Sequence, residues 1–277
     1  MLKSLLVTIA ASCVLSAAQA QQLRTPAPSP TQVVRQDFGI SSVELNYSRP
    51  SIKGRKLYSD LAPTGQVWRT GANGATRLKF ADDVTIGGQQ LKAGEYAVFT
   101  VPTPNEWEVI INKGTANWGT DYKQDLDVVR FKVPATNSSN FVETFTMQFA
   151  NMKNNSMDLQ MMWGNTVVNV PIMIDSDKKI MGQIDQLMNK DNRPYFAAAM
   201  YYMDNGKDIN QAAQWFEKAA EAQPNAYWVH YQRANALAKL GKKKEAMEIS
   251  QKSMALAKEQ NNPDYVRLNE KLQASLK

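Results

Sequence analysis

The hydrophobic pattern of the chain changes period once, near Asp175, and this change divides the sequence into two parts. Before Asp175, apolar and polar residues alternate with a period of two, which places the apolar side chains on one face of a β-strand. After Asp175, apolar residues recur with the helical period, as at Ile180, Ile184 and Leu187. The sequence therefore predicts a β-rich part followed by a helical part.

The first part contains a series of short segments that are typical of strands. They are rich in β-branched and aromatic residues, and no helical segment separates them. Turn residues occur at Asp82-Asp83, Gly87-Gly88 and Gly164-Asn165, and we expect the last pair to form a tight hairpin. The predicted fold class is mainly β plus α, with an antiparallel β-sandwich over residues 33–175. The predicted strands are 33–38, 42–47, 76–80, 96–101, 107–112, 128–133, 141–149, 157–163 and 166–174.

The second part begins with a predicted linking helix, residues 176–192, and continues with an internal repeat of about 34 residues. Large, small and helix-breaking residues follow one another in the order that tetratricopeptide repeats share, and a last helix from Pro263 is expected to cap the stack. Residues 193–277 therefore resemble tetratricopeptide-like repeats with a capping helix, which commonly bind a protein partner. The alternative is a helical brace that binds nothing. The matching residues are Phe196, Ala199, Ala212, Phe216, Ala219 and Pro224, then Ala234, Leu237, Gly241, Ala246 and Ser253.

The first 20 residues are typical of an export signal, with Lys3 before a short apolar run and Ala18-Gln19-Ala20 as a cleavage site. The run is too short to cross a bilayer, which takes about 20 apolar residues, and no later segment approaches that length. A polar, proline-rich leader over residues 21–32 is expected to be flexible. We predict a periplasmic or secreted protein without a transmembrane segment. Cys13, the single cysteine, offers a lipoprotein as the alternative.

Charge and composition exclude several function classes. The formal net charge is +6 and no nucleic-acid-binding module is recognisable, so we predict no nucleic-acid partner. His230 is the only histidine and the mature chain has no cysteine, so we predict no metal site and no catalytic triad. The glycines around Ala72 lie between strands and open no helix, so no phosphate loop and no cofactor is predicted.

Basic residues are concentrated between Arg49 and Lys79, where Asp60 is the single acid. Arginine binds carboxylate, phosphate or sulfate through two parallel hydrogen bonds, and tryptophan rings stack on sugars. We therefore predict one pocket for a small anionic or sugar-like ligand. The basic residues of the stretch are Arg49, Lys53, Arg55, Lys56, Arg69, Arg77 and Lys79. The predicted ligand-binding residues are Arg49, Arg55, Arg69, Asn73 and Trp118.

A set of short motifs occurs in a fixed order through the same part of the chain. Over residues 33–174 the chain resembles a family of exported bacterial proteins known as domain of unknown function 2911. The resemblance implies the β-fold and export, and it implies no function because the family has no established activity. Gly74 departs from relatives that have an acidic residue at this point. The motifs are Ser48-Arg49-Pro50, Lys53-Gly54-Arg55, Trp68-Arg69-Thr70-Gly71-Ala72-Asn73, Gly94-Glu95-Tyr96, Trp107, Asn112-Lys113, Trp118-Gly119 and Trp163-Gly164-Asn165.

Three alternatives to a ligand pocket remain open at this point. First, strand alternation puts Trp68 and Arg69 on opposite faces, so Trp68 would fill the core while Arg69 pairs with Asp60 at the surface. Second, two acids would make a carboxylate-dependent glycan hydrolase, although no spacing pairs any two of them and no catalytic residue is predicted. Third, the protein would be a purely structural adaptor. The acids that lie near the aromatic motifs are Asp60, Glu95, Asp121 and Asp125.

Overall fold

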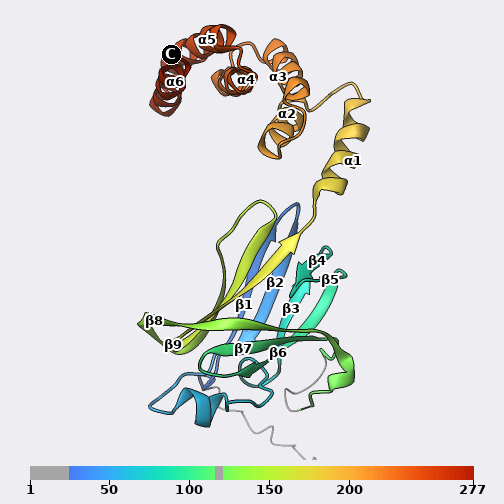
Figure 1. The fold of residues 1–277 in the computed structure, drawn as a ribbon, viewed down its shortest axis with the longest axis vertical. Coiled ribbons are helices and arrows are strands. Elements are labelled where there is room, and N and C mark those ends of the chain that lie inside the picture. The colour runs from blue at the N-terminus through green and yellow to red at the C-terminus, as the bar shows by residue number, and fades with distance from the viewer. Residues whose placement is uncertain (1–24, 116–120) are drawn as a thin grey trace, which may run out of the picture. The chain divides into compact units, whose positions relative to one another are not determined.

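The computed structural model describes residues 25–115 and 121–277. They form two compact units, one that ends at Ile174 and one that begins at Asp175 (Figure 1). Within the described residues the first unit holds nine strands and the second holds six α-helices, which confirms the predicted fold class. The predicted signal peptide, the first residues of the predicted leader and Trp118 lie outside the described residues.

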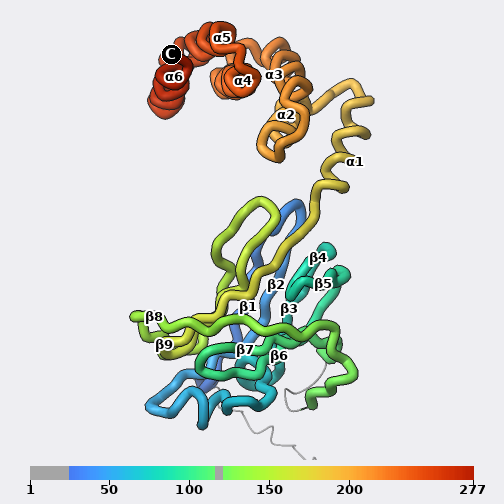
Figure 2. Tube along the Cα trace, in the orientation of Figure 1, coloured from blue at the N-terminus to red at the C-terminus, as the bar shows by residue number. Residues whose placement is uncertain are grey.

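The nine strands are antiparallel, in the hydrogen-bonded order β1-β2-β3-β6-β7-β8-β9-β4-β5. The last two long strands, β8 and β9, run side by side (Figure 2). Strand β8 pairs with β7 as far as Pro134 and with β9 from Ala135 onward, so it passes from one sheet to the other. The strands are β1 Thr31–Phe38, β2 Ser41–Ser48, β3 Thr76–Phe80, β4 Val84–Ile86, β5 Gln89–Leu91, β6 Gly94–Pro102, β7 Glu106–Asn112, β8 Asp127–Ala150 and β9 Ser156–Ile174.

The core of the first unit lies between the two sheets. Alternate residues of β2, such as Val43 and Leu45, pack in one hydrophobic cluster with Phe145 of β8 and Trp163 of β9. The Tyr47 hydroxyl joins the sheets directly, because it donates to the Met147 carbonyl oxygen at 3.1 Å. The arrangement is the predicted β-sandwich, since each sheet buries one face against the other.

Several local predictions differ from the structure. The segments predicted as separate strands 128–133 and 141–149 form the single strand β8. The expected hairpin at Gly164-Asn165 is wrong, because β9 continues through both residues. Gly164 has a φ of 57° and lies opposite Val142, where the β8–β9 ladder changes register. A glycine at positive φ fits a bulge as well as a turn. The predicted leader also ends too late, because β1 already begins at Thr31.

A further difference concerns β4 and β5, which are strands that the sequence does not predict. They form a short hairpin around Gly87-Gly88, where the sequence predicted only a turn. Each strand has three residues, which is too short for a period of two to be recognised. A Cβ atom at Gly87 would lie 2.2 Å from the Phe131 ring, so this turn requires glycine for space.

The second unit contains consecutive helices that pack as neighbours, α2 with α3 and α4 with α5, with α6 against α5. Fully buried alanines, among them Ala199, Ala212, Ala234 and Ala246, let the helices approach closely. No helix in the described ranges combines the length and apolar character needed to cross a bilayer. The helices are α1 Asp177–Met188, α2 Tyr195–Asp204, α3 Ile209–Ala222, α4 Tyr227–Lys239, α5 Lys243–Glu259 and α6 Pro263–Leu276.

Candidate functional site: a pocket with two unneutralised arginines

The segment between β2 and β3 has an unusual backbone. Thr70 has a φ of 54° and Asn73 a φ of 61°. Thr70 is fully buried, and a β-branched residue at positive φ is strained by about 1–3 kcal/mol. Its neighbours hold this conformation, because the Thr76 hydroxyl donates to the Thr70 carbonyl oxygen at 2.5 Å and the Thr70 hydroxyl donates to Thr100 Oγ1 at 3.2 Å. The fold therefore fixes this loop in one shape.

Gly71 makes the same loop possible. Its φ is 154°, and a Cβ atom there would lie 2.9 Å from the Ser48 carbonyl oxygen. The backbone approaches β2 so closely that only glycine fits without a shift. The loop consequently turns back on β2 and presents Arg69 and Asn73 on its outer side, while Trp68 and Thr70 are buried.

A pocket of about 330 Å³ lies beside this loop. Arg55, Arg69 and Asn73, three of the predicted ligand-binding residues, all line it. Its volume is at the lower end of the range of about 300–1,000 Å³ that is usual for small-molecule sites. The full lining is Ser29, Pro50, Arg55, Asp60, Leu61, Trp68, Arg69, Gly71, Ala72, Asn73 and Trp163.

Both arginines of the pocket are oriented by main-chain carbonyl groups. Arg69 Nη1 donates to the Asn73 carbonyl oxygen at 2.8 Å. Arg55 donates through Nε to the Ile52 carbonyl oxygen at 3.1 Å and through Nη2 to the Ser51 carbonyl oxygen at 2.6 Å. Within the described ranges neither guanidinium forms an ion pair with a carboxylate. A guanidinium has five N–H donors, so each keeps its charge and further donors for a ligand.

Asp60 supplies the carboxylate of the pocket. Its Oδ2 accepts from the Lys56 main-chain N–H at 2.9 Å, and its Oδ1 accepts from the Ser59 hydroxyl at 2.7 Å. These two hydrogen bonds, followed by the charges of Lys56 and Arg55, lower the pKa of Asp60 below its usual value. Asp60 is therefore ionised at neutral pH, and it does not form the surface ion pair with Arg69 that one alternative expected.

The tryptophans that line the pocket are largely covered. Trp68 is 7% exposed and stacks on Trp163, with ring centroids 5.5 Å apart and an angle of 15° between the rings. Trp107 and Phe145 contact Trp68 edge to face. Trp68 is thus a core residue that supports the pocket, and its ring offers no free face for stacking on a sugar.

Two of the predicted ligand-binding residues do not line this pocket. Arg49 turns toward β8, where Nε donates to the Phe145 carbonyl oxygen at 3.1 Å and Nη2 donates to Thr146 Oγ1 at 2.7 Å. Trp118 lies outside the described residues, so its predicted role stays a prediction. Ser29 lines the pocket although it belongs to the predicted leader. No local motif could have identified Ser29. It is placed at the pocket by a tertiary contact, in which the Arg49 main-chain N–H donates to the carbonyl oxygen of the neighbouring Pro30.

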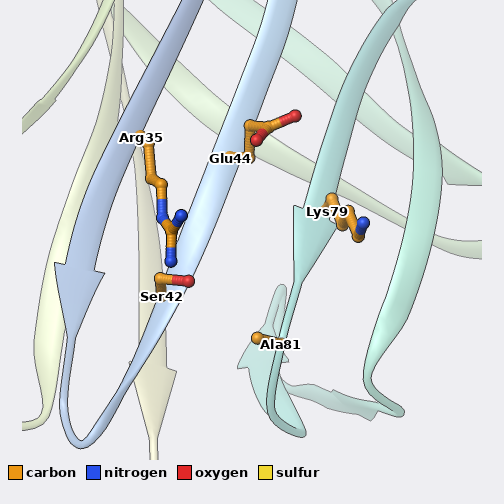
Figure 3. A pocket seen from close by; sticks show the side chains of 5 residues that line it. All are labelled: Arg35, Ser42, Glu44, Lys79 and Ala81. Atoms are coloured by element: carbon orange, nitrogen blue, oxygen red, sulfur yellow. The ribbon is translucent and has the colours of Figure 1, made fainter.

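The C-terminal end of the basic stretch lies on another surface. Arg77 of β3 forms an ion pair with Glu95 of β6 at 3.6 Å. Lys79 lies across the strands from Glu44, which in turn faces Arg35. Figure 3 shows this surface, where Glu44 lies between Arg35 and Lys79 beside a shallow pocket of about 250 Å³. The charges alternate from strand to strand, which is the pairing that stabilises a sheet surface.

One further arginine, Arg130 of β8, lies in a fully paired cluster. It donates to Asp127 Oδ2 at 2.8 Å, to Glu108 Oε2 at 2.6 Å and to the Tyr122 hydroxyl at 2.5 Å. Asp127 also accepts from Tyr122 at 2.6 Å and from Asn112 at 2.7 Å. Burial and the hydrogen bond to Asp127 raise the pKa of the Tyr122 phenol.

In the described part of the chain, no three histidine, cysteine, aspartate or glutamate residues lie close enough together to hold a metal ion. His230 is 1% exposed, and its Nε2 lies 2.8 Å from the Pro224 carbonyl oxygen. It is a core residue of the helical unit.

These features define a class of protein: a β-sandwich that carries a small cationic surface pocket, followed by a unit of paired helices. The family model described as "Protein of unknown function (DUF2911)" matches residues 29–172, which is more than half of the chain, and the chain belongs to this family. No protein with a curated description and no solved structure matches it. The matched range contains every residue that lines the pocket, whereas the helical unit lies outside it.

Proposed function

We propose that the β-sandwich is a non-enzymatic binding module whose pocket holds a small anionic ligand through Arg55 and Arg69, with Asn73 beside them. The observation that carries the proposal is that both guanidinium groups line one pocket and are oriented by carbonyl groups instead of carboxylates. Arginines held in this way are pre-oriented and still charged. Charge-assisted hydrogen bonds to a carboxylate, phosphate or sulfate are the interactions that such groups form best.

The geometry favours an anion over the other ligands considered. A stacked sugar is disfavoured because Trp163 and its neighbours cover Trp68. Glycoside hydrolysis needs two carboxyl groups about 5–9.5 Å apart. Among the described residues that line the pocket, Asp60 is the only acid. We therefore prefer binding to catalysis.

The proposal is tested by anion-dependent thermal stabilisation at constant ionic strength. A ligand that binds only the folded state raises its stability by RT ln(1 + [L]/Kd). Sulfate and a series of small carboxylates should raise the melting temperature of the wild type, and Arg69→Gln should abolish the rise. Arg77→Gln is the matched control, because it removes the same charge from an ion pair outside the pocket. Equal stabilisation of both variants would contradict the proposal.

For the helical unit, we propose that residues 193–277 form tetratricopeptide-like repeats that bind a protein partner. The support is the series of neighbouring helices with fully buried alanines at their contacts, closed by α6. Affinity capture with the full chain should recover a specific protein that a chain ending at residue 192 does not recover. If both chains recover the same proteins, the helical unit is a brace.

We also propose that the protein is exported and acts in the periplasm or outside the cell, as part of the cell envelope. The support is the N-terminal sequence, with its short apolar run and Ala18-Gln19-Ala20. Mass spectrometry of the mature protein should find Gln21 as the first residue. A lipid-modified N-terminus at Cys13 would instead establish the lipoprotein alternative.

A further inference from the structure

The pocket contains one charged group more than the binding of a simple anion requires. Two guanidinium groups and one ionised carboxylate line the same 330 Å³. An inorganic anion would gain from both arginines and be repelled by Asp60. An inorganic anion can therefore bind through the arginines, but it makes no use of Asp60.

Asp60 still has hydrogen-bonding capacity for a ligand. A carboxylate has about four acceptor positions, and Asp60 uses two of them, for the Lys56 main-chain N–H and the Ser59 hydroxyl. Because these bonds come from its own turn, they fix the direction of the carboxylate without neutralising it. The Asp60 side chain is therefore a fixed acceptor for a donor that the ligand brings.

Apolar side chains complete the lining. Pro50, Leu61 and Ala72 contribute to the pocket together with Trp68. Leu61 and Ala72 are partly exposed, so an apolar substituent of a ligand would cover them, whereas a ligand with only charged groups would not.

We propose that the pocket takes a zwitterion, an α-amino acid with an apolar side chain. Its carboxylate would be bound by Arg55 and Arg69, its ammonium group by Asp60, and its side chain would contact Pro50, Leu61 and Ala72. The proposal rests on the proposed function and adds the class of ligand to it. Each charge of the ligand then meets an opposite charge of the pocket, and one positive charge remains.

Isothermal titration of the full chain with four matched compounds tests this directly. Phenylalanine, phenyllactate and 3-phenylpropionate share ring and carboxylate and differ at one carbon, which carries an ammonium group, a hydroxyl group or hydrogen. Phenylalaninamide keeps the ammonium group and lacks the carboxylate. We expect phenylalanine to bind about tenfold more tightly than 3-phenylpropionate, since one charge-assisted hydrogen bond separates them. Phenylalaninamide should not bind.

The Asp60→Asn variant should bind phenylalanine no more tightly than 3-phenylpropionate. Its binding of 3-phenylpropionate should be unchanged or tighter, because the repulsion between Asp60 and the ligand carboxylate is lost. Asp158→Asn is the matched control, since Asp158 is an acid of β9 outside the pocket, and it should retain the preference. If Asp60→Asn does not fold, the wild type gives the same information. Raising the pH until the amino group of phenylalanine loses its proton should then abolish its advantage over 3-phenylpropionate.

The outcomes separate the two proposals. If 3-phenylpropionate binds as tightly as phenylalanine and Arg69→Gln abolishes both, the zwitterion is ruled out and anion binding stands. If no compound of the series and no sulfate binds in a manner that depends on Arg69, both proposals are overturned.

Discussion

The β-sandwich uses arginine in two opposite ways. Arg130 is held by two carboxylates, Asp127 and Glu108, and by the Tyr122 hydroxyl, so its charge is neutralised within the fold. Arg55 and Arg69 are held by carbonyl oxygens, which orient a guanidinium without neutralising it. The first arrangement contributes to stability and leaves little for a ligand. The second contributes less to stability and leaves charge and donors exposed in a pocket.

This difference leads to a general expectation for substitutions. Removing one member of a paired, partly buried cluster leaves its partners without hydrogen bonds, and this is costly. Removing an arginine that bonds only to a carbonyl group leaves one oxygen that water can reach. Substitutions in the Arg130 cluster should therefore lower stability more than ligand binding, and substitutions of the pocket arginines should lower ligand binding more than stability.

The largest expected effect is that of Asp127→Ala. The Asp127 side chain is 11% exposed and accepts from Arg130, Tyr122 and Asn112, so its loss leaves three donors without their acceptor. We expect the free energy of unfolding of the β-sandwich to fall by about 3 kcal/mol, as measured by urea denaturation. Anion binding by the folded protein should be unchanged. A loss below about 1 kcal/mol would mean that the cluster is no more than a surface ion pair.

Gly71→Ala should have the second largest effect. The added Cβ atom would meet the Ser48 carbonyl oxygen at 2.9 Å in a backbone conformation that disfavours alanine. We expect a loss of about 2 kcal/mol of stability together with weaker ligand binding, because the loop that presents Arg69 must shift. Gly74→Ala is the control, since no atom lies within 4 Å of its added Cβ. If both variants behave alike, the shape of the loop does not matter for the pocket.

The next prediction concerns His230, a buried side chain that the fold keeps neutral. Burial, together with the charges of Lys252 and Arg233, lowers the pKa of His230 below its usual 6.5. Above pH 6.5 the imidazole is neutral in both the folded and the unfolded state. As the pH falls below 6.5 the unfolded state binds the proton first, so stability is lost, by at most about 1.4 kcal/mol per pH unit.

Urea denaturation of the helical unit between pH 7 and pH 5 tests this sign. The wild type should lose stability toward pH 5, and His230→Gln should show a flatter profile, because the chain has no other histidine. A wild type whose stability rises toward pH 5 would show that the protonated imidazole finds a partner in the fold.

The smallest effect on stability is expected for Arg69→Gln. Arg69 gives one hydrogen bond to the Asn73 carbonyl oxygen, and water can replace it. The free energy of unfolding should change by no more than about 0.5 kcal/mol in the absence of anions, as measured by urea denaturation. A loss of several kcal/mol would show that Arg69 is a structural residue and that the comparison with Arg130 does not hold.

The sequence predicted the larger features of the fold well, because they depend on local patterns. The period of two in β2 and the recurrence of alanine at Ala212 and Ala246 are visible without coordinates. The joining of two predicted segments into β9 was not visible, because a glycine at positive φ suits either a turn or a bulge. The change of sheet within β8 was not visible either, because it depends on pairing with strands that are distant in sequence.

The candidate site was predictable in part. Arg55, Arg69 and Asn73 were found from their concentration in one loop-rich stretch, and they meet in one pocket. Arg49 belongs to the same stretch but donates to a carbonyl group of β8. This contact was not predictable, because the partner lies 96 residues away in sequence. Which arginine is captured and which remains available is decided by tertiary contacts that no local motif encodes.

The most direct test of the account compares Arg69→Gln with Arg130→Gln, in urea denaturation with and without a saturating small carboxylate. We expect Arg130→Gln to lose about 2 kcal/mol of stability and to retain stabilisation by the anion. Arg69→Gln should retain its stability and lose stabilisation by the anion. The opposite assignment, or equal responses of the two variants, would contradict the claim that the pocket arginines are reserved for a ligand.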